Sequence, residues 1–487
     1  MKQGKFSQPR TSADYIRDGQ TPPRRKPQRR RRRLNPRFIA LCVILLVLLI
    51  LIFTLVGRLF SGKPGETPPV STNAPTSTEA PTEAPTEAPT EPVDPIVSTA
   101  TISATGDVLM HLPVITSGYV SSTGSYDFDG IFQYLEDYSA AADYAVANLE
   151  TTLAGTTNGY SYSGYPCFNC PDEIADALKT AGFDMMLTAN NHCYDTRTVG
   201  LTRTLQVAKE TGLTTLGTQE NAQAVDYHIE TINGIPVGMM CYSYATADSY
   251  PDRPSLNGIL VGTEADGMVN YFDYDQLDLF YTDVARTIAT MEREGAKATV
   301  IYIHWGEEYQ LNANSSQVAI AQKLCDLGVD VIVGGHPHVV QPVELLTSTT
   351  DDSHKTVCLY SMGNAISNQQ RQNMNLNTGH TEDGVLFSFS FTEYVDGEVE
   401  LTGVDILPTW VYLGTIEGAK AYRIIPLDNE ISDWSAAFGI SASTAESAKA
   451  SYDRTMALVG TGLAEAQEYL SGRQETKLAE ITGGNEG

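Results

Sequence analysis

The stretch "DLGVDVIVGGHPHVVQP", residues 326–342, joins an apolar run directly to two glycines and two histidines. The β-branched residues of the run are typical of a buried strand. His336 and His338 follow the strand with only Pro337 between them, in a chain that has eight histidines in all. An extended backbone around Pro337 would turn both imidazoles to the same side. The pair therefore indicates that this strand end has a function.

Five other segments follow the same pattern, in which an apolar run ends abruptly in polar residues. They are "TISATGD" ending at Asp107, "YAVANLE" ending at Glu150, "FDMMLTANNH" ending at His192, "TVIYIHWGEE" through His304, and "TVCLYSMGN" ending at Asn364. Amphipathic segments that close with glycine lie between them, at 171–182, 196–212, 274–295 and 315–328. Alternating strands and helices predict an α/β fold, in which ligands bind beyond the carboxyl ends of the strands.

The polar residues at these strand ends form one candidate site. They are Asp107, His111, Glu150, Asn190, Asn191, His192, Asp195, His304, Glu307, His336 and His338. Carboxylates and imidazoles without thiolates suit Mn²⁺, Zn²⁺ or Fe²⁺, and a bridging carboxylate could hold two ions roughly 3.5–4 Å apart. Each residue also has an ordinary interpretation, since histidines form hydrogen bonds, Asp107 could be a turn residue, and Asn190 and Asn191 could cap a helix. The metal prediction therefore depends on their co-occurrence.

The N-terminal region predicts a membrane anchor. Residues 1–37 carry thirteen Lys and Arg against two Asp, and residues 38–57 are an uncharged run of twenty, enough to cross a hydrocarbon core of ~30 Å. Because basic flanks stay cytoplasmic, we expect a single span with a cytoplasmic N-terminus and an extracellular C-terminal domain. A cleaved signal peptide is the alternative, although the apolar run exceeds the usual ~7–15 residues. The anchor explains the basic tail, so we expect no nucleic-acid partner.

Composition divides the rest of the chain. Residues 58–96 are rich in Pro, Thr and Glu, with an "EAPT" repeat that favours an extended linker. A folded domain is predicted over 97–427, followed by a helical C-terminal extension at 428–487 that is rich in Ala and Ser. A single C-x-x-C pair at Cys167 and Cys170 does not complete a zinc site, and a local disulfide there stays open.

Six motifs together resemble one protein family. "ATGDVLMH", "ANLETTLAG", "LTANNHCYD", "IHWGEEY", "GGHPHVVQPVE" and "YSMGNAISN", in this order, resemble the CapA family of poly-γ-glutamate capsule biosynthesis proteins, within the calcineurin-like metallophosphoesterase superfamily. The resemblance covers about residues 97–410. It implies a four-layer α/β/β/α sandwich with a divalent-metal site, expected to hold two ions, at the strand ends.

The resemblance also implies individual roles. The implied metal ligands are Asp107, His111, Glu150, Asn191, His304, His336 and His338. His192 would be the acid that protonates a leaving oxygen, and Asp195, three residues on, is placed to orient it. The sequence departs from the superfamily pattern twice, since Asp107 and His111 are four apart instead of two, and Glu150 replaces a bridging Asp.

Two classes of function follow from these features. The first is a membrane-anchored extracytoplasmic hydrolase or transferase, metal-dependent, that acts on an anionic envelope polymer such as poly-γ-glutamate together with membrane synthase subunits. The second is a non-catalytic polymer-handling or export subunit of such a synthase complex. The chain carries a net charge of −27. A polyanion would therefore be repelled unless metal ions or a basic surface attract it locally.

Overall fold

The computed structural model describes residues 94–246, 253–376, 378–416 and 419–483. The predicted cytoplasmic tail, the span at 38–57 and the linker up to residue 93 lie outside these ranges. Within them, no helix combines the length and the apolar character needed to cross a membrane.

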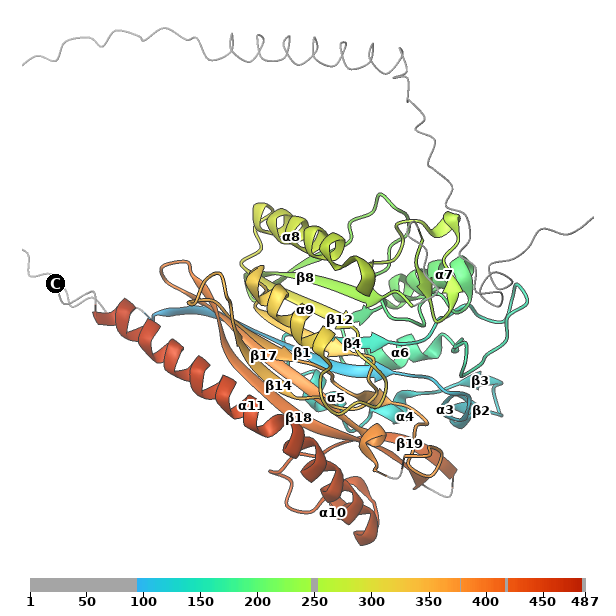
Figure 1. The fold of residues 1–487 in the computed structure, drawn as a ribbon. Coiled ribbons are helices and arrows are strands. Elements are labelled where there is room, and N and C mark those ends of the chain that lie inside the picture. The colour runs from blue at the N-terminus through green and yellow to red at the C-terminus, as the bar shows by residue number, and fades with distance from the viewer. Residues whose placement is uncertain (1–93, 247–252, 377, 417–418, 484–487) are drawn as a thin grey trace, which may run out of the picture. The chain divides into compact units, whose positions relative to one another are not determined.

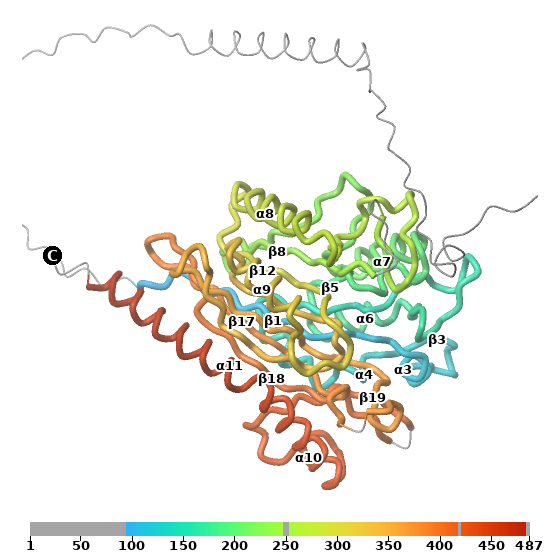
Figure 2. The backbone as a smooth tube through the Cα atoms, in the orientation of Figure 1, coloured from blue at the N-terminus to red at the C-terminus, as the bar shows by residue number. Residues whose placement is uncertain are grey.

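One sheet runs in the order β19-β18-β17-β1-β4-β5-β6, and β16 also pairs with β1. Its strands are β1 (Ile96–Val108), β4 (Tyr144–Leu149), β5 (Met185–Leu187), β6 (Thr214–Leu216), β16 (Asn364–Ile366), β17 (Asp383–Tyr394), β18 (Val399–Ile416) and β19 (Ala419–Pro426). The strands β1, β4, β5 and β6 are parallel, whereas β17, β18 and β19 are antiparallel. The first and the late strands of the domain therefore lie side by side, as the tube in Figure 2 shows for β1 and β17.

A second sheet runs in the order β11-β8-β12-β13-β15-β14, and β7 also pairs with β8. Its strands are β7 (His228–Ile232), β8 (Ile235–Tyr244), β11 (Tyr271–Phe272), β12 (Ala298–His304), β13 (Val331–Gly335), β14 (Val343–Thr347) and β15 (Lys355–Leu359). Pairing is parallel from β11 to β15, and β7 and β14 are antiparallel. The predicted α/β class is confirmed, with both sheets mixed.

Helices pack on the outer face of each sheet (Figure 1). Apolar residues of α3 (Leu112–Ser117), α4 (Asp129–Phe132), α6 (Glu173–Thr180) and α7 (Arg197–Thr211) share a cluster with the first sheet, and those of α8 (Leu277–Arg293) and α9 (Ser315–Asp326) share one with the second. The four amphipathic segments of the sequence therefore form α6, α7, α8 and α9. Gly212 ends α7 in the left-handed conformation, as a C-terminal glycine should.

Shorter elements complete the described part of the chain. They are β2 (Tyr119–Val120), β3 (Ser125–Tyr126), α5 (Glu136–Ser139), β9 (Ser255–Leu256), β10 (Ile259–Leu260), α10 (Trp434–Phe438) and the 3₁₀ turns at Thr263–Ala265, Tyr274–Gln276 and His380–Glu382.

The largest apolar cluster lies between the two sheets. Ile102 and Val146 of the first sheet share it with Val300 of the second. The long helix α11 (Ala442–Gly483) adds Val459 and Leu463 to the same cluster and runs along β18 and β14 (Figure 1). The segment that the sequence predicts as a helical extension is thus helical from Ala442 and packs against both sheets.

Parallel register brings the predicted site residues to one edge of the sandwich. Asp107 of β1 lies opposite Asn148 of β4 on one side and Asn364 of β16 on the other. In the second sheet His304 of β12 lies opposite Gly335 of β13. Two strands of each sheet therefore end at the same level, with polar residues at their carboxyl ends.

Candidate metal centre

Asp107 is a fully buried carboxylate at the end of β1. Its Oδ1 accepts a hydrogen bond of 2.7 Å from Asn148 Nδ2, and its Oδ2 lies 3.0 Å from Nδ1 of His338. Burial by itself raises the pKa of Asp107, but the hydrogen bond and the charge of His338 outweigh that effect and hold the pKa below its ordinary value. Asp107 is therefore ionised inside the protein.

Glu150 directly follows β4, and within the described residues neither of its buried carboxylate oxygens has a hydrogen-bond partner. Its Oε1 lies 3.3 Å from His304 Nε2, and its Oε2 lies 3.9 Å from His338 Nδ1, without the alignment of hydrogen bonds. A buried carboxylate without donors is costly unless a cation faces it. Glu150, His336 and His338 each offer a ligand atom, and the three atoms lie within 4.8 Å of one another.

His336 and His338 are held in an unusual backbone conformation. Their φ angles are 96° and 55°, in the left-handed region that residues with a side chain rarely adopt. The predicted extended chain through Pro337 is therefore wrong, because β13 ends at Gly335 and the backbone turns sharply. Such conformations cost on the order of 1–3 kcal/mol each and cluster at functional sites.

The two imidazoles differ in charge. His336 Nδ1 is buried and has no hydrogen-bond partner within the described residues. Burial, and then the charges of His304 and His338, hold the pKa of His336 well below its ordinary value. Burial also lowers the pKa of His338, but Glu150 and Asp107 outweigh it and raise that pKa to about 9. His336 is thus a neutral imidazole with a free ring nitrogen, beside a protonated His338 that faces two carboxylates.

Asn191 and His304 connect the two sheets. His304 ends β12, and Asn191 lies in the loop that follows β5. Nε2 of His304 lies 2.9 Å from Oδ1 of Asn191. In the same loop Asn190 Nδ2 donates to Leu149 O at 2.9 Å. Neither asparagine caps α7, whose N-cap residue is Thr196. Their side chains therefore contact residues at the ends of β12 and β4, and the alternative that they cap a helix is wrong.

His192 and Asp195 form a second buried pair beside the first. Nδ1 of His192 lies 2.8 Å from Asp195 Oδ2, which also accepts a 2.6 Å hydrogen bond from the backbone N–H of Phe168. The ring of Phe168 packs edge-on against His192, with centroids 4.7 Å apart. Burial lowers the pKa of His192, but the hydrogen bond and charge of Asp195 outweigh it and raise the pKa above its ordinary value. Cys167 and Cys170, on either side of Phe168 and Asn169, are free thiols.

Two of the predicted residues lie apart from the carboxylates. His111 Nδ1 lies 3.3 Å from both Leu109 O and the N–H of Asn368, and its ring packs edge-on against Phe168. Burial lowers the pKa of His111 to about 4. Glu307 is exposed. The described contacts therefore place His111 at the edge of the site, and the exposed Glu307 is not buried with the other site residues.

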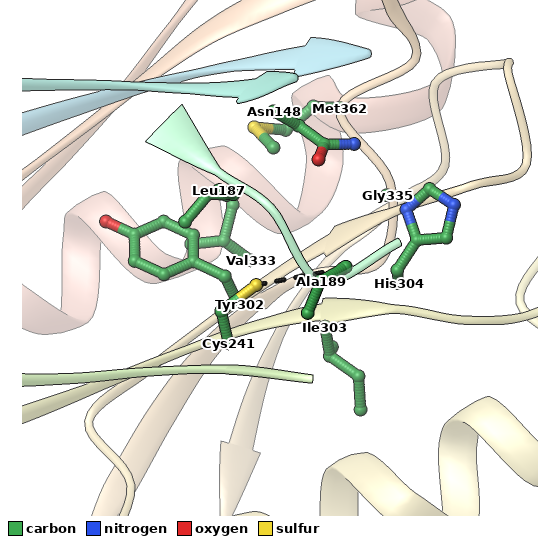
Figure 3. Close-up of a pocket in the computed structure, with 10 residues that line it drawn as sticks. All are labelled: Asn148, Leu187, Ala189, Cys241, Tyr302, Ile303, His304, Val333, Gly335 and Met362. Atoms are coloured by element: carbon green, nitrogen blue, oxygen red, sulfur yellow. Dashed lines mark hydrogen bonds between the residues drawn. The ribbon is translucent and has the colours of Figure 1, made fainter. Parts of the chain in front are cut away.

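A small cavity lies between the sheets behind the cluster. Asn148, His304 and Gly335 line it together with apolar residues of both sheets, as the close-up in Figure 3 shows. Its volume is about 10 Å³, which is the space of about one water molecule. The cavity is therefore too small to admit a ligand much larger than a water molecule.

One residue of the site, Asn148, was missed from the sequence. Asn148 lies two positions before Glu150, and strand alternation could have revealed that both side chains face the same way. Gly335 has a steric role, since a Cβ atom there would lie 3.1 Å from Asp107 Oδ1 and 3.4 Å from His304 Nδ1. A side chain at Gly335 would therefore push Asp107 Oδ1 away by a few tenths of an ångström.

The chain is similar to capsule synthesis proteins of known families. Residues 101–369, more than half of the chain, match the family described as bacterial capsule synthesis protein PGA_cap. The PGA biosynthesis protein CapA of Bacillus subtilis is 25% identical over 309 residues, which cover 62% of this chain and 71% of that protein. The capsule biosynthesis protein CapA of Bacillus anthracis is 26% identical over 274 residues, which cover 55% of this chain and 60% of that protein.

A solved structure from Staphylococcus aureus, a candidate 5′-nucleotidase in complex with α-ketoglutarate, is 13% identical with a TM-score of 0.37 and covers 66% of this chain and 56% of its own. At this level the likeness assigns neither fold nor activity. The alignments thus span less than two thirds of the B. anthracis and S. aureus chains. The family resemblance predicted from the six motifs is confirmed, and the chain belongs to the bacterial capsule synthesis protein family PGA_cap.

Proposed function

We propose that this chain is a membrane-anchored, extracytoplasmic component of poly-γ-glutamate capsule synthesis, with a divalent-metal hydrolase or transferase site that acts on the anionic polymer. One observation carries the proposal: both oxygens of Glu150 and Nδ1 of His336 are buried without hydrogen-bond partners in the described residues, next to a ring nitrogen of His338. Burying such polar groups is unfavourable unless a ligand binds to them.

The donor set fits a metal ion. Asp107, Glu150, Asn191, His304, His336 and His338 would hold it. Carboxylate, amide and imidazole donors without thiolates suit Mn²⁺, Zn²⁺ or Fe²⁺, and a set of six donors would be large enough for two ions. We leave His111 out of this set because its described contacts lie elsewhere. Divalent metal in this position would supply Lewis-acid polarisation of a polymer oxygen and neutralise its negative charge.

His192 has the geometry of a proton donor. Its Nδ1 is held by Asp195, which leaves Nε2 without a protein partner among the described residues. The hydrogen bond and charge of Asp195 outweigh burial and raise the pKa of His192, which favours the form of the ring that carries a proton at Nε2 as well as at Nδ1. In this proposal His192 delivers that proton to the leaving oxygen or nitrogen, and Asp195 keeps the ring oriented.

The two mixed sheets with helices on their outer faces support a four-layer α/β/β/α arrangement of the metallophosphoesterase type. The anchor belongs to the same proposal: residues 38–57 would cross the cell membrane once, residues 1–37 would remain cytoplasmic, and the linker would hold the domain outside, near membrane synthase subunits.

A non-catalytic polymer-handling or export subunit is the second candidate. It is favoured by the position of His111, whose ring contacts Leu109, Phe168 and Asn368 instead of the carboxylates. Without His111 the site has one metal donor fewer than the resemblance implies. Such a site would suit a structural or polymer-binding ion.

Complementation tests the proposal. In a strain lacking the gene, Glu150→Gln keeps the size of the side chain but removes its charge, and we expect polymer output to be lost. The control is Glu230→Gln, in a surface pair with His228, which should complement fully. Full output with Glu150→Gln would overturn the proposal. Metal loss in that variant with intact output would favour the second candidate.

A further inference from the structure

The turn between β9 and β10 carries an asparagine that reaches the His192–Asp195 pair. Asn257 and Gly258 form this two-residue turn, with φ angles of 48° and 68°. The neighbouring Leu256 is fully buried in an apolar cluster with Tyr194 and residues of α7. The hairpin is therefore anchored beside the loop that contains the pair.

The side-chain amide of Asn257 contacts two oxygens. Its Nδ2 donates to Asp195 Oδ1 at 2.8 Å and to the backbone oxygen of Pro166 at 2.8 Å. Both N–H bonds of the amide nitrogen are thus directed at acceptors, which fixes the orientation of the amide. The same nitrogen lies 3.3 Å from Nδ1 of His192.

Asp195 is consequently held by three N–H groups from different parts of the chain. Asn257 binds Oδ1, while the backbone of Phe168 and the ring of His192 bind Oδ2. Without the Asn257 contact, Oδ1 would lose this donor and the carboxylate could rotate. The direction in which Oδ2 meets Nδ1 of His192, and with it the plane of the ring, would then be less firmly fixed.

We infer that Asn257 is a positioning residue for the acid His192, and that it acts through Asp195. The inference rests on the proposed role of His192. The ordinary alternative is that Asn257 is present only because Asn-Gly suits a tight hairpin turn with two positive φ angles. Gly and Asp also suit the first position of such a turn. Substitution by either one therefore separates the two explanations.

The chain contains a matched control. Asn233 and Gly234 form the two-residue turn between β7 and β8, with φ angles of 51° and 89°. Nδ2 of Asn233 donates to the backbone oxygen of Thr99, in a hairpin that carries none of the site residues. Asn233→Gly therefore removes an equivalent amide from an equivalent turn.

The experiment uses the full chain and compares Asn257→Gly, Asn257→Asp and Asn233→Gly in the deletion strain. We expect polymer output to fall at least about tenfold in both Asn257 variants. In Asn257→Asp the amide donor is replaced by a second carboxylate, which would repel the carboxylate of Asp195. Asn233→Gly should match the wild type, and metal per protein should be unchanged in all three. Full output with Asn257→Gly would overturn the inference.

A spectroscopic measurement separates this result from failure of the proposed function. In ¹⁵N-histidine-labelled protein, the low-field Nδ1–H resonance assigned by its loss in His192→Gln should shift or broaden in both Asn257 variants and stay in place in Asn233→Gly. An unchanged resonance in the Asn257 variants would also overturn the inference. If His192→Ala complements fully, the proposed acid fails, and the resonance alone decides whether Asn257 orients the pair.

Discussion

Nδ1 of His338 lies 3.0 Å from Oδ2 of Asp107, although 231 positions separate the two residues in the chain. The contact joins the loop after β13 in one sheet to the end of β1 in the other. Both side chains are buried. The pair therefore contributes to the stability of the sandwich as well as to the site.

Asp107→Asn should destabilise the metal-free protein, because a protonated His338 would lose a buried carboxylate partner. Breaking such a pair costs about 3 kcal/mol or more. Urea unfolding in the presence of a chelator measures the change. The control is Asp453→Asn, which breaks a solvent-exposed contact with Lys449 and should cost at most about 1 kcal/mol. Equal effects of the two variants would contradict this account of the pair.

His192→Ala should abolish polymer output and leave bound metal nearly unchanged, since the ring contacts Asp195 and Phe168 and is proposed as an acid. Elemental analysis of the purified variant, beside complementation, checks both parts. Loss of metal in this variant would make His192 a ligand instead.

The alternation of strands and helices, and the convergence of their polar ends, could be predicted from the sequence because they follow from periodicity and chain direction. The local backbone conformation could not be predicted in this way. Pro337 suggests an extended chain, but the tertiary structure holds His336 and His338 at positive φ. Spacing alone also could not show that the ring of His111 turns toward Asn368. The contact from Asn257 to Asp195 spans 62 positions and has no local signal.

His111→Gln should change how stability depends on pH. Burial holds the pKa of His111 at about 4 in the folded protein, against about 6.5 when unfolded. The unfolded chain therefore binds the proton first as the pH falls. The wild type should lose stability between pH 6.5 and 4, by at most about 3 kcal/mol from this residue.

The glutamine variant lacks this contribution, so its stability should fall less over the same range in urea unfolding with a chelator. Parallel pH profiles of the two proteins would contradict the prediction. Loss of metal from His111→Gln would restore the ligand role that the sequence resemblance implies.

The domain from about Asp94 onward should be soluble without detergent, and protease added to intact cells should degrade it in the full-length protein. Only residues 38–57 are uniformly apolar. Protection of the domain from external protease would contradict the proposed orientation.

Metal per protein in His336→Ala and His338→Ala tests the central claim most directly. The two residues offer ring nitrogens to one cluster with Glu150. Each variant should lose most of the metal found in the wild type, with the double variant little worse because the ligands act as a unit. His354→Ala is the control, since its ring contacts the backbone of Val329. Full metal content in both single variants would contradict the metal centre.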